Sequence, residues 1–117
     1  MAFPLSRALF LAAFSVPMLG LGVSVTAAAI APAPAVQVAI KGFAFTPQVL
    51  TVAIGTTVTW TNADEDPHTV TATDRSFHSA ALDTGGKFSY TFTRAGEFAY
   101  FCQLHPHMTG KVIVKAR

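Results

Sequence analysis

The sequence predicts an all-β protein, a sandwich of two β-sheets. After the first 29 residues, short runs rich in β-branched and aromatic residues alternate with turn residues at intervals of about eight to twelve residues. Several of these runs alternate apolar with polar residues, which is the pattern of strands buried on one face. No helical period persists over about ten residues in the same region. Consecutive strands without helices are typical of sandwiches and barrels.

Eight short strands are expected along the chain, several of them separated by Gly or Pro. Residues 88–93 alternate most clearly, because Ser or Thr separates Phe88, Tyr90 and Phe92. We expect these aromatic side chains, and Trp60, to lie in the core. The expected strands cover residues 36–40, 43–47, 50–54, 56–62, 69–73, 88–93, 98–102 and 111–115.

The first 29 residues are expected to be a secretory signal. Arg7 precedes an apolar stretch over residues 8–25, and small residues follow at positions 26–29. The alternative is an uncleaved membrane anchor, but Pro17, Gly20 and Gly22 interrupt a stretch that is short for a transmembrane helix. The predicted organisation is a signal (1–29), an Ala/Pro spacer (30–35) and one domain (36–117), periplasmic or otherwise extracytoplasmic and without a membrane span after cleavage.

The composition of the predicted mature chain excludes several kinds of partner. From Ile30 onward, seven Lys and Arg face six Asp and Glu, which leaves the domain nearly neutral. This balance argues against nucleic acid and against an anionic membrane surface, and we expect a monomer. Cys102 is the single cysteine, so no disulfide can form within the chain. An exported thiol must then be buried, paired with another chain or held by a metal.

Three potential metal ligands share one loop near the C-terminus. Cys102, His105 and Met108 are placed three residues apart, so that the loop can wrap a single ion, and Pro106 stiffens the turn. His68, in an earlier loop, can reach the same end of a sandwich. Two imidazoles and a thiolate with a weak axial thioether form the blue copper electron-transfer site, whereas structural zinc sites normally lack Met. The sequence therefore predicts one type 1 copper ion.

Five short motifs resemble the cupredoxin family, in particular the amicyanin, pseudoazurin and plastocyanin group. They are Phe43 to Pro47, Val58 to Asn62, Asp66 to Val70, Phe88 to Phe92 and the loop from Cys102 to Met108. The resemblance covers residues 36–115. It implies a Greek-key sandwich with copper at one end and His105 as the more exposed ligand. It also implies that Asn62 ties the two ligand loops together, as a residue that orients the ligands.

Two functions are compatible with such a site. The first is a carrier that passes single electrons between redox partner proteins as its copper cycles between Cu(I) and Cu(II). The alternative is a periplasmic protein that binds and delivers copper without transferring electrons, and the ligand set alone does not separate the two. We expect no enzyme, because copper oxidases and nitrite reductases need a second copper site with further histidines, and only His78 and His107 remain.

Three features beside the predicted ligands have simpler interpretations. His107 takes a loop position that is aromatic in amicyanin, and it could be a spare ligand, a pH-sensitive group or a docking residue. Since Met108 already fills the axial position, we expect His107 to be an exposed imidazole. His78 is expected to face solvent. The acidic run at residues 64–66 is expected to serve the turn before Pro67, although it could also steer a cationic partner.

Overall fold

The computed structural model describes residues 12–24 and 35–117. Contacts divide the chain into residues 1–30 and 31–117, which are considered separately. Residues 12–24 have exposed side chains and belong to no helix or strand. The rest of the predicted signal, and the predicted spacer up to Pro34, lie outside the described residues. Within the described ranges, no helix is long and apolar enough to cross a membrane.

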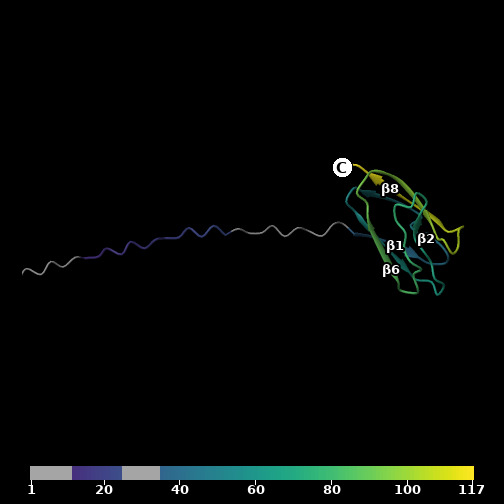
Figure 1. The fold of residues 1–117 in the computed structure, drawn as a ribbon, viewed down its shortest axis with the longest axis horizontal. Coiled ribbons are helices and arrows are strands. Elements are labelled where there is room, and N and C mark those ends of the chain that lie inside the picture. The colour runs from purple at the N-terminus through teal and green to yellow at the C-terminus, as the bar shows by residue number, and fades with distance from the viewer. Residues whose placement is uncertain (1–11, 25–34) are drawn as a thin grey trace, which may run out of the picture. The chain divides into compact units, whose positions relative to one another are not determined.

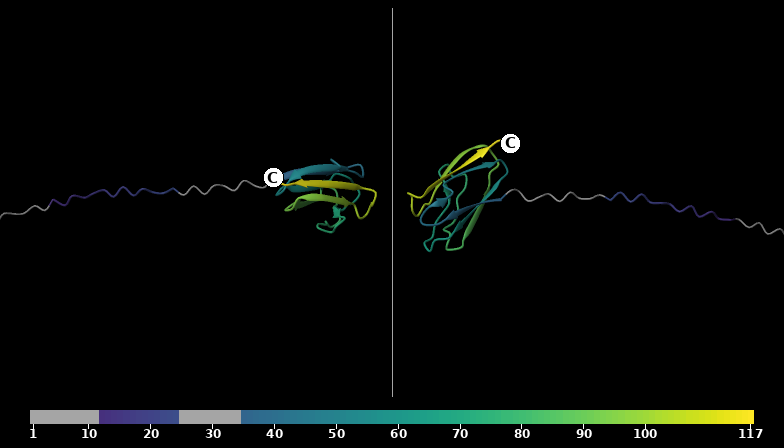
Figure 2. Two further views of the ribbon diagram at one scale, coloured as in Figure 1. Left: turned by 90° about the horizontal axis from the view of Figure 1, so that it is seen from above. Right: turned by 180° about the vertical axis from the view of Figure 1, so that it is seen from behind.

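The domain is a sandwich of two four-stranded sheets, as the sequence predicts (Figure 1). One sheet has the strand order β2-β1-β4-β6 and the other β3-β8-β7-β5. Figure 2 shows the sandwich from above and from behind. The pairs β1·β4 and β3·β8 are parallel, and the other pairs are antiparallel. The strands are β1 (Ala35–Ile40), β2 (Phe45–Thr46), β3 (Val49–Ala53), β4 (Thr57–Asn62), β5 (Thr71–Ala72), β6 (Lys87–Thr91), β7 (Gly96–Phe101) and β8 (Thr109–Lys115).

Period-two alternation points one face of each long strand into the core. In β4, Val58, Trp60 and Asn62 are buried while the threonines between them are partly exposed. Trp60 is fully buried and lies edge-on to Tyr100 of the opposite sheet. Phe92 is buried as predicted, whereas Phe88 and Tyr90 are only partly buried and pack against the core.

Two expected strands are reduced to two residues each. β2 begins at Phe45, and Phe43 lies in the preceding loop with a backbone φ of 56° and a half-exposed side chain. The expected strand over 69–73 is reduced to β5, which pairs with the end of β7 through Thr71 and Phe101. In both places contacts with distant residues determine the backbone conformation. The alternation of Phe43 with Phe45 therefore wrongly predicted that Phe43 belongs to a strand.

Gly110 is required by the close approach of Tyr100 from the neighbouring strand. The two residues are direct partners in the β7·β8 ladder, and a Cβ at position 110 would lie 2.3 Å from Cζ of Tyr100. We expect Gly110→Ala to lower the free energy of unfolding by about 1–3 kcal/mol, because the core must shift to admit the methyl group. Urea unfolding of the metal-free protein measures this change. Thr109→Ala, at the exposed neighbouring residue, is the control. An equal loss of unfolding free energy in that variant would contradict the steric explanation.

Candidate metal centre

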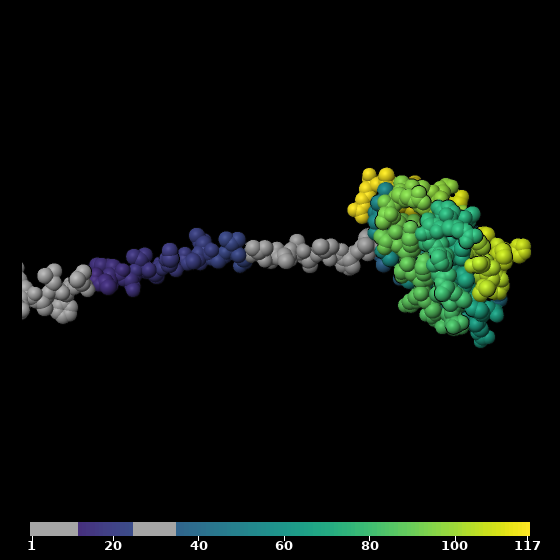
Figure 3. Space-filling view, in the orientation of Figure 1, coloured from purple at the N-terminus to yellow at the C-terminus, as the bar shows by residue number. Residues whose placement is uncertain are grey.

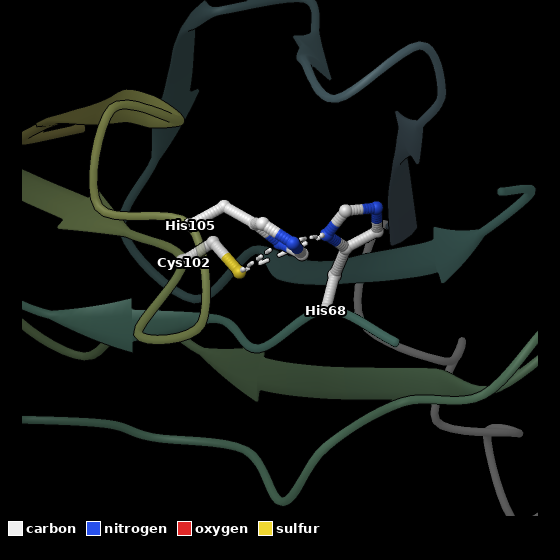
Figure 4. Close-up of side chains that lie close together, drawn as sticks. All are labelled: His68, Cys102 and His105. Carbon is white, nitrogen blue, oxygen red and sulfur yellow. Dashed lines mark hydrogen bonds between the residues drawn. The ribbon is translucent and has the colours of Figure 1, made fainter. Parts of the chain in front are cut away.

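Three of the four predicted ligands converge at one end of the sandwich (Figure 4). The donor atoms of His68, Cys102 and His105 all lie within 4.8 Å of one another. Cys102 Sγ is 3.7 Å from Nδ1 of His68 and 3.7 Å from Nδ1 of His105, and the two Nδ1 atoms are 3.2 Å apart. The prediction that the two ligand loops meet at the same end of the fold is confirmed.

Main-chain hydrogen bonds hold each loop in place. His68 exchanges two bonds with Leu82, at 3.1 and 2.7 Å, which anchor the segment between β4 and β5. Cys102 directly follows β7, and its N–H donates to Met108 O at 3.0 Å. Within the same loop, the N–H of Met108 donates to His105 O at 2.9 Å. The loop is therefore a closed turn that returns to the strand end.

The spacing of the three donor atoms would suit a single metal ion held between them. A first-row ion lies about 2.0–2.1 Å from an imidazole nitrogen and about 2.3 Å from a thiolate sulfur. Trigonal angles then separate nitrogen from sulfur by about 3.7 Å and the two nitrogens by about 3.5 Å. The observed nitrogen–sulfur distances match, and the nitrogen–nitrogen distance of 3.2 Å requires a slightly smaller angle. A soft thiolate with two imidazoles is the planar donor set of blue copper sites.

Asp64 orients His68, a role that was not predicted from the sequence. Its Oδ2 lies 2.9 Å from Nε2 of His68, the ring nitrogen that faces away from the other donors. A carboxylate at this position favours the tautomer in which Nε2 carries the proton, so that the lone pair of Nδ1 points to the metal position. The only signal in the sequence was an acidic residue four positions before the histidine.

The same carboxylate also holds the loop that carries Phe43. The N–H groups of Gly42 and Phe43 donate to Asp64 at 2.7 and 2.9 Å. These bonds, that of Phe43 first, outweigh partial burial and lower the pKa of Asp64 below its ordinary value of 3.8, and His68 lowers this pKa further. Asp64 is therefore ionised at neutral pH, and it joins two segments of the chain at the metal site.

Phe43 covers the two histidine rings from the surface. Its ring lies edge-on to His68 and His105, with centroid distances of 5.3 and 5.1 Å. His68 is fully buried and His105 is partly exposed, as the resemblance implied. Of the three converging residues, His105 is therefore the one that reaches the surface, beside the half-exposed Phe43.

The predicted role of Asn62 is wrong in one respect. Its amide donates to the carbonyls of Asp66 and Leu82, and its oxygen accepts from Asp64 N, so it supports only the loop of His68. Thr69 joins the two ligand loops instead. Its N–H donates to the fully buried Cys102 Sγ at 3.3 Å, and its Oγ1 accepts from Gln103 N at 2.7 Å. The donated bond fixes the position of the sulfur relative to the loop of His68.

Met108 lies in the ligand loop with its side chain buried in the hydrophobic core, and its role as the axial ligand stays a prediction. The two remaining histidines are exposed, as expected. His107 is exposed and lies outside the group of three donors, beside a small surface pocket that it shares with Phe43 and Met108. His78 is exposed and bridges to Thr71 through its main chain.

Asp64→Asn should weaken the site without removing a ligand. In the variant, an amide NH₂ group replaces one of the two Asp64 oxygens, both of which accept hydrogen bonds. We therefore expect the free energy of unfolding to fall by about 1–3 kcal/mol. Copper affinity should fall by about tenfold or more. The reduction potential should rise, since His68 loses a negative partner that favours Cu(II). Urea unfolding, metal competition and voltammetry measure the three effects. Glu65→Gln removes the same charge from the exposed next residue, and equal effects in both variants would contradict the positioning role of Asp64.

Comparisons with known proteins agree with this geometry. The family model of the cupredoxin-like domain matches residues 11–114. Amicyanin from Paracoccus denitrificans is 41% identical over 75 residues, which are 60% of this chain and 56% of that protein. Plastocyanin from Tetradesmus obliquus is 38% identical over 85 residues, which are 61% of this chain and 58% of that protein. The chain thus spans little more than half the length of these relatives.

Solved structures show the same fold. A purple cupredoxin from Nitrosopumilus maritimus superimposes with a TM-score of 0.65 and 33% identity, covering 68% of this chain and 98% of that structure. The Cu(I) form of an amicyanin variant gives a TM-score of 0.66 and 35% identity, covering 69% of this chain and 82% of that structure. With the matching family model and the convergent His₂Cys donor set, these similarities show that the chain belongs to the cupredoxin-like family.

Proposed function

We propose that this protein is an exported blue copper electron carrier. One type 1 copper is held by His68, Cys102 and His105, with Met108 as the weak axial ligand, and it passes single electrons between redox partner proteins. The observation that carries the proposal is the convergence of two Nδ1 atoms on a buried sulfur at 3.7 Å each. The copper supplies the one-electron Cu(I)/Cu(II) couple.

The surrounding residues suit rapid electron transfer. Asp64 orients His68, and Thr69 donates to the sulfur, so hydrogen bonds from the chain hold both donors in place. A prearranged geometry that compromises between the preferences of Cu(I) and Cu(II) changes little when the oxidation state changes. His105 is the partly exposed donor and offers a route to a partner at the surface. Carriage of electrons, without catalysis, also agrees with the amicyanins and the plastocyanin among the relatives.

The alternative function is copper binding and delivery without electron transfer. A delivery protein must release its metal, which is easier when the ligands are exposed. Here His68 and Cys102 are fully buried, so release would require the ligand loops to open. This burial supports the redox function over delivery.

The proposed extracytoplasmic location rests on the predicted signal, and the similarity to amicyanins supports it. We expect cleavage near Ala28 or Ala29. Intact-mass analysis of protein purified from the periplasmic fraction tests this location. A mass that still includes residues 1–26, in protein that only detergent extracts, would contradict it.

Cyclic voltammetry of the copper protein and of Met108→Gln tests the proposed function. The wild type should cycle reversibly with one electron. A harder oxygen donor favours Cu(II) over Cu(I), so Met108→Gln should keep its colour and have a lower reduction potential, by about 0.1 V or more. A potential that does not move would contradict the axial role of Met108. If neither form cycles reversibly, copper delivery becomes the better explanation.

A further inference from the structure

A pocket with polar lining residues lies beside the metal loop. None of the four proposed copper ligands lines it. It has a volume of about 200 Å³ and is lined by Thr71, Arg75, His78 and Gln103. Three of these residues belong to the hairpin that starts at β5, and Gln103 directly follows Cys102. In Figure 3 the teal-green surface of this hairpin lies next to the yellow-green surface of the metal loop.

The pocket gathers hydrogen-bond donors around the positive charge of Arg75. A guanidinium, an imidazole, a carboxamide and a hydroxyl group line it. The nearest acid in the sequence does not neutralise Arg75, because Asp74 is engaged by Arg94 at 3.5 Å and by Ser76 N at 2.9 Å. Within residues 12–24 and 35–117, Arg75 forms no salt bridge. An unpaired guanidinium with further donors is the recognition chemistry of carboxylates and other oxyanions.

Arg75 has a positive backbone φ, which is rare for a residue with a side chain and is often found at binding sites. Its φ of 66° lies in the left-handed region, which costs about 1–2 kcal/mol for a residue with a Cβ. Gly, Asn or Asp normally occupies such turn positions. The turn is closed by Arg75 N donating to Ala72 O at 3.1 Å, and Ala72 N donates to Phe77 O at 2.9 Å. A strained residue held by its surroundings points to a function for its side chain.

The wall of the pocket is connected to the copper thiolate through one residue. Gln103 N donates to Thr69 Oγ1, and Thr69 N donates to Cys102 Sγ. Thr71 Oγ1 also lies 3.1 Å from Thr69 Oγ1. A group bound in the pocket would therefore lie against Gln103, which follows Cys102 in the chain, and against Thr71, which reaches the sulfur through Thr69. Electrons could leave by this side, through Cys102, as well as through His105.

We propose that this pocket is an anion subsite that receives a carboxylate side chain of an acidic redox partner. The proposal rests on the proposed electron-transfer function. Charge complementarity favours an acidic partner, and the volume admits a carboxylate with its methylene stem. In the reaction, one electron leaves Cu(I), which becomes Cu(II), and the acceptor on the partner gains it. No proton or bond is exchanged.

The binding step is tested with hexacyanochromate(III), a redox-inactive trianion that broadens nearby NMR resonances. Titrated into the diamagnetic Cu(I) protein, it should broaden the amide signals of Arg75, His78 and Gln103. Arg75→Gln should weaken this binding by about twofold to fivefold, the range for one exposed charge. Lys87→Gln removes the same charge from an exposed residue of β6 and should leave the binding nearly unchanged. Spectra without the probe verify that both variants are folded.

The transfer step is tested with two small oxidants of opposite charge. Arg75→Gln should slow the oxidation of the Cu(I) protein by anionic hexacyanoferrate(III) by about twofold to fivefold, the same factor as for binding. It should not slow oxidation by cationic tris(phenanthroline)cobalt(III). Equal effects of Arg75→Gln and Lys87→Gln, or broadening centred elsewhere, would overturn the proposal and leave only general attraction of anions. The NMR titration involves no electron transfer, so its failure is distinguishable from failure of the redox function, which voltammetry reports.

Discussion

Cys102→Ser should abolish the blue colour of the copper protein completely. The sulfur is fully buried and lies 3.7 Å from each imidazole nitrogen, so it is the donor that both histidines face. The intense visible band of a type 1 site arises from charge transfer between the thiolate and Cu(II). A serine oxygen is a harder donor and cannot supply that transition. We expect the band to disappear even where some copper remains bound.

Visible absorption and metal analysis on the same samples measure this loss. Gln103→Ser is the matched control, because the adjacent side chain faces the polar pocket and is not among the converging donors. It should keep the band. A colourless wild-type protein that contains one copper per chain would contradict the blue copper site itself.

His105→Ala should also destroy the native spectrum, whereas His107→Ala should preserve it. The two residues have the same side chain in the same loop, so each variant controls for the other. Nδ1 of His105 lies 3.2 Å from Nδ1 of His68, while His107 is exposed and outside the donor group. We expect copper affinity to fall by more than about tenfold in His105→Ala and by less than about twofold in His107→Ala.

Rescue by free imidazole makes this prediction sharper. His105 is partly exposed, so its removal opens the site towards solvent. Added imidazole should then enter the gap and restore a band close to that of the wild type. Absorption spectra during an imidazole titration provide the measurement. Equal loss of colour in the two histidine variants would mean that the loop binds its metal through a different histidine.

Local pattern was sufficient for the fold class and for locating the turn that carries three of the proposed ligands. Alternation along residues 57–62 and 109–115 reports which face of each strand is buried, and that burial is what a sandwich requires. Cys102, His105 and Met108 lie close together in the chain, so a single turn brings them together whatever the rest of the fold does. Only His68 had to be matched to them by its chemistry, since its loop is far away in the sequence.

Where a residue's role depends on a partner far away in the sequence, only the tertiary structure reveals that role. Phe43 looked like a strand residue, but Asp64, 21 residues later, holds its N–H and turns the ring over both histidines. The link between the ligand loops was expected of Asn62 and belongs to Thr69, whose N–H faces a sulfur 33 residues away. Periodicity records the burial of a residue but not its hydrogen-bond partner across the fold. The pairing of Asp64 with His68, like the pocket of Arg75 beside Gln103, exists only once the two sheets have packed and set the loops at their common end.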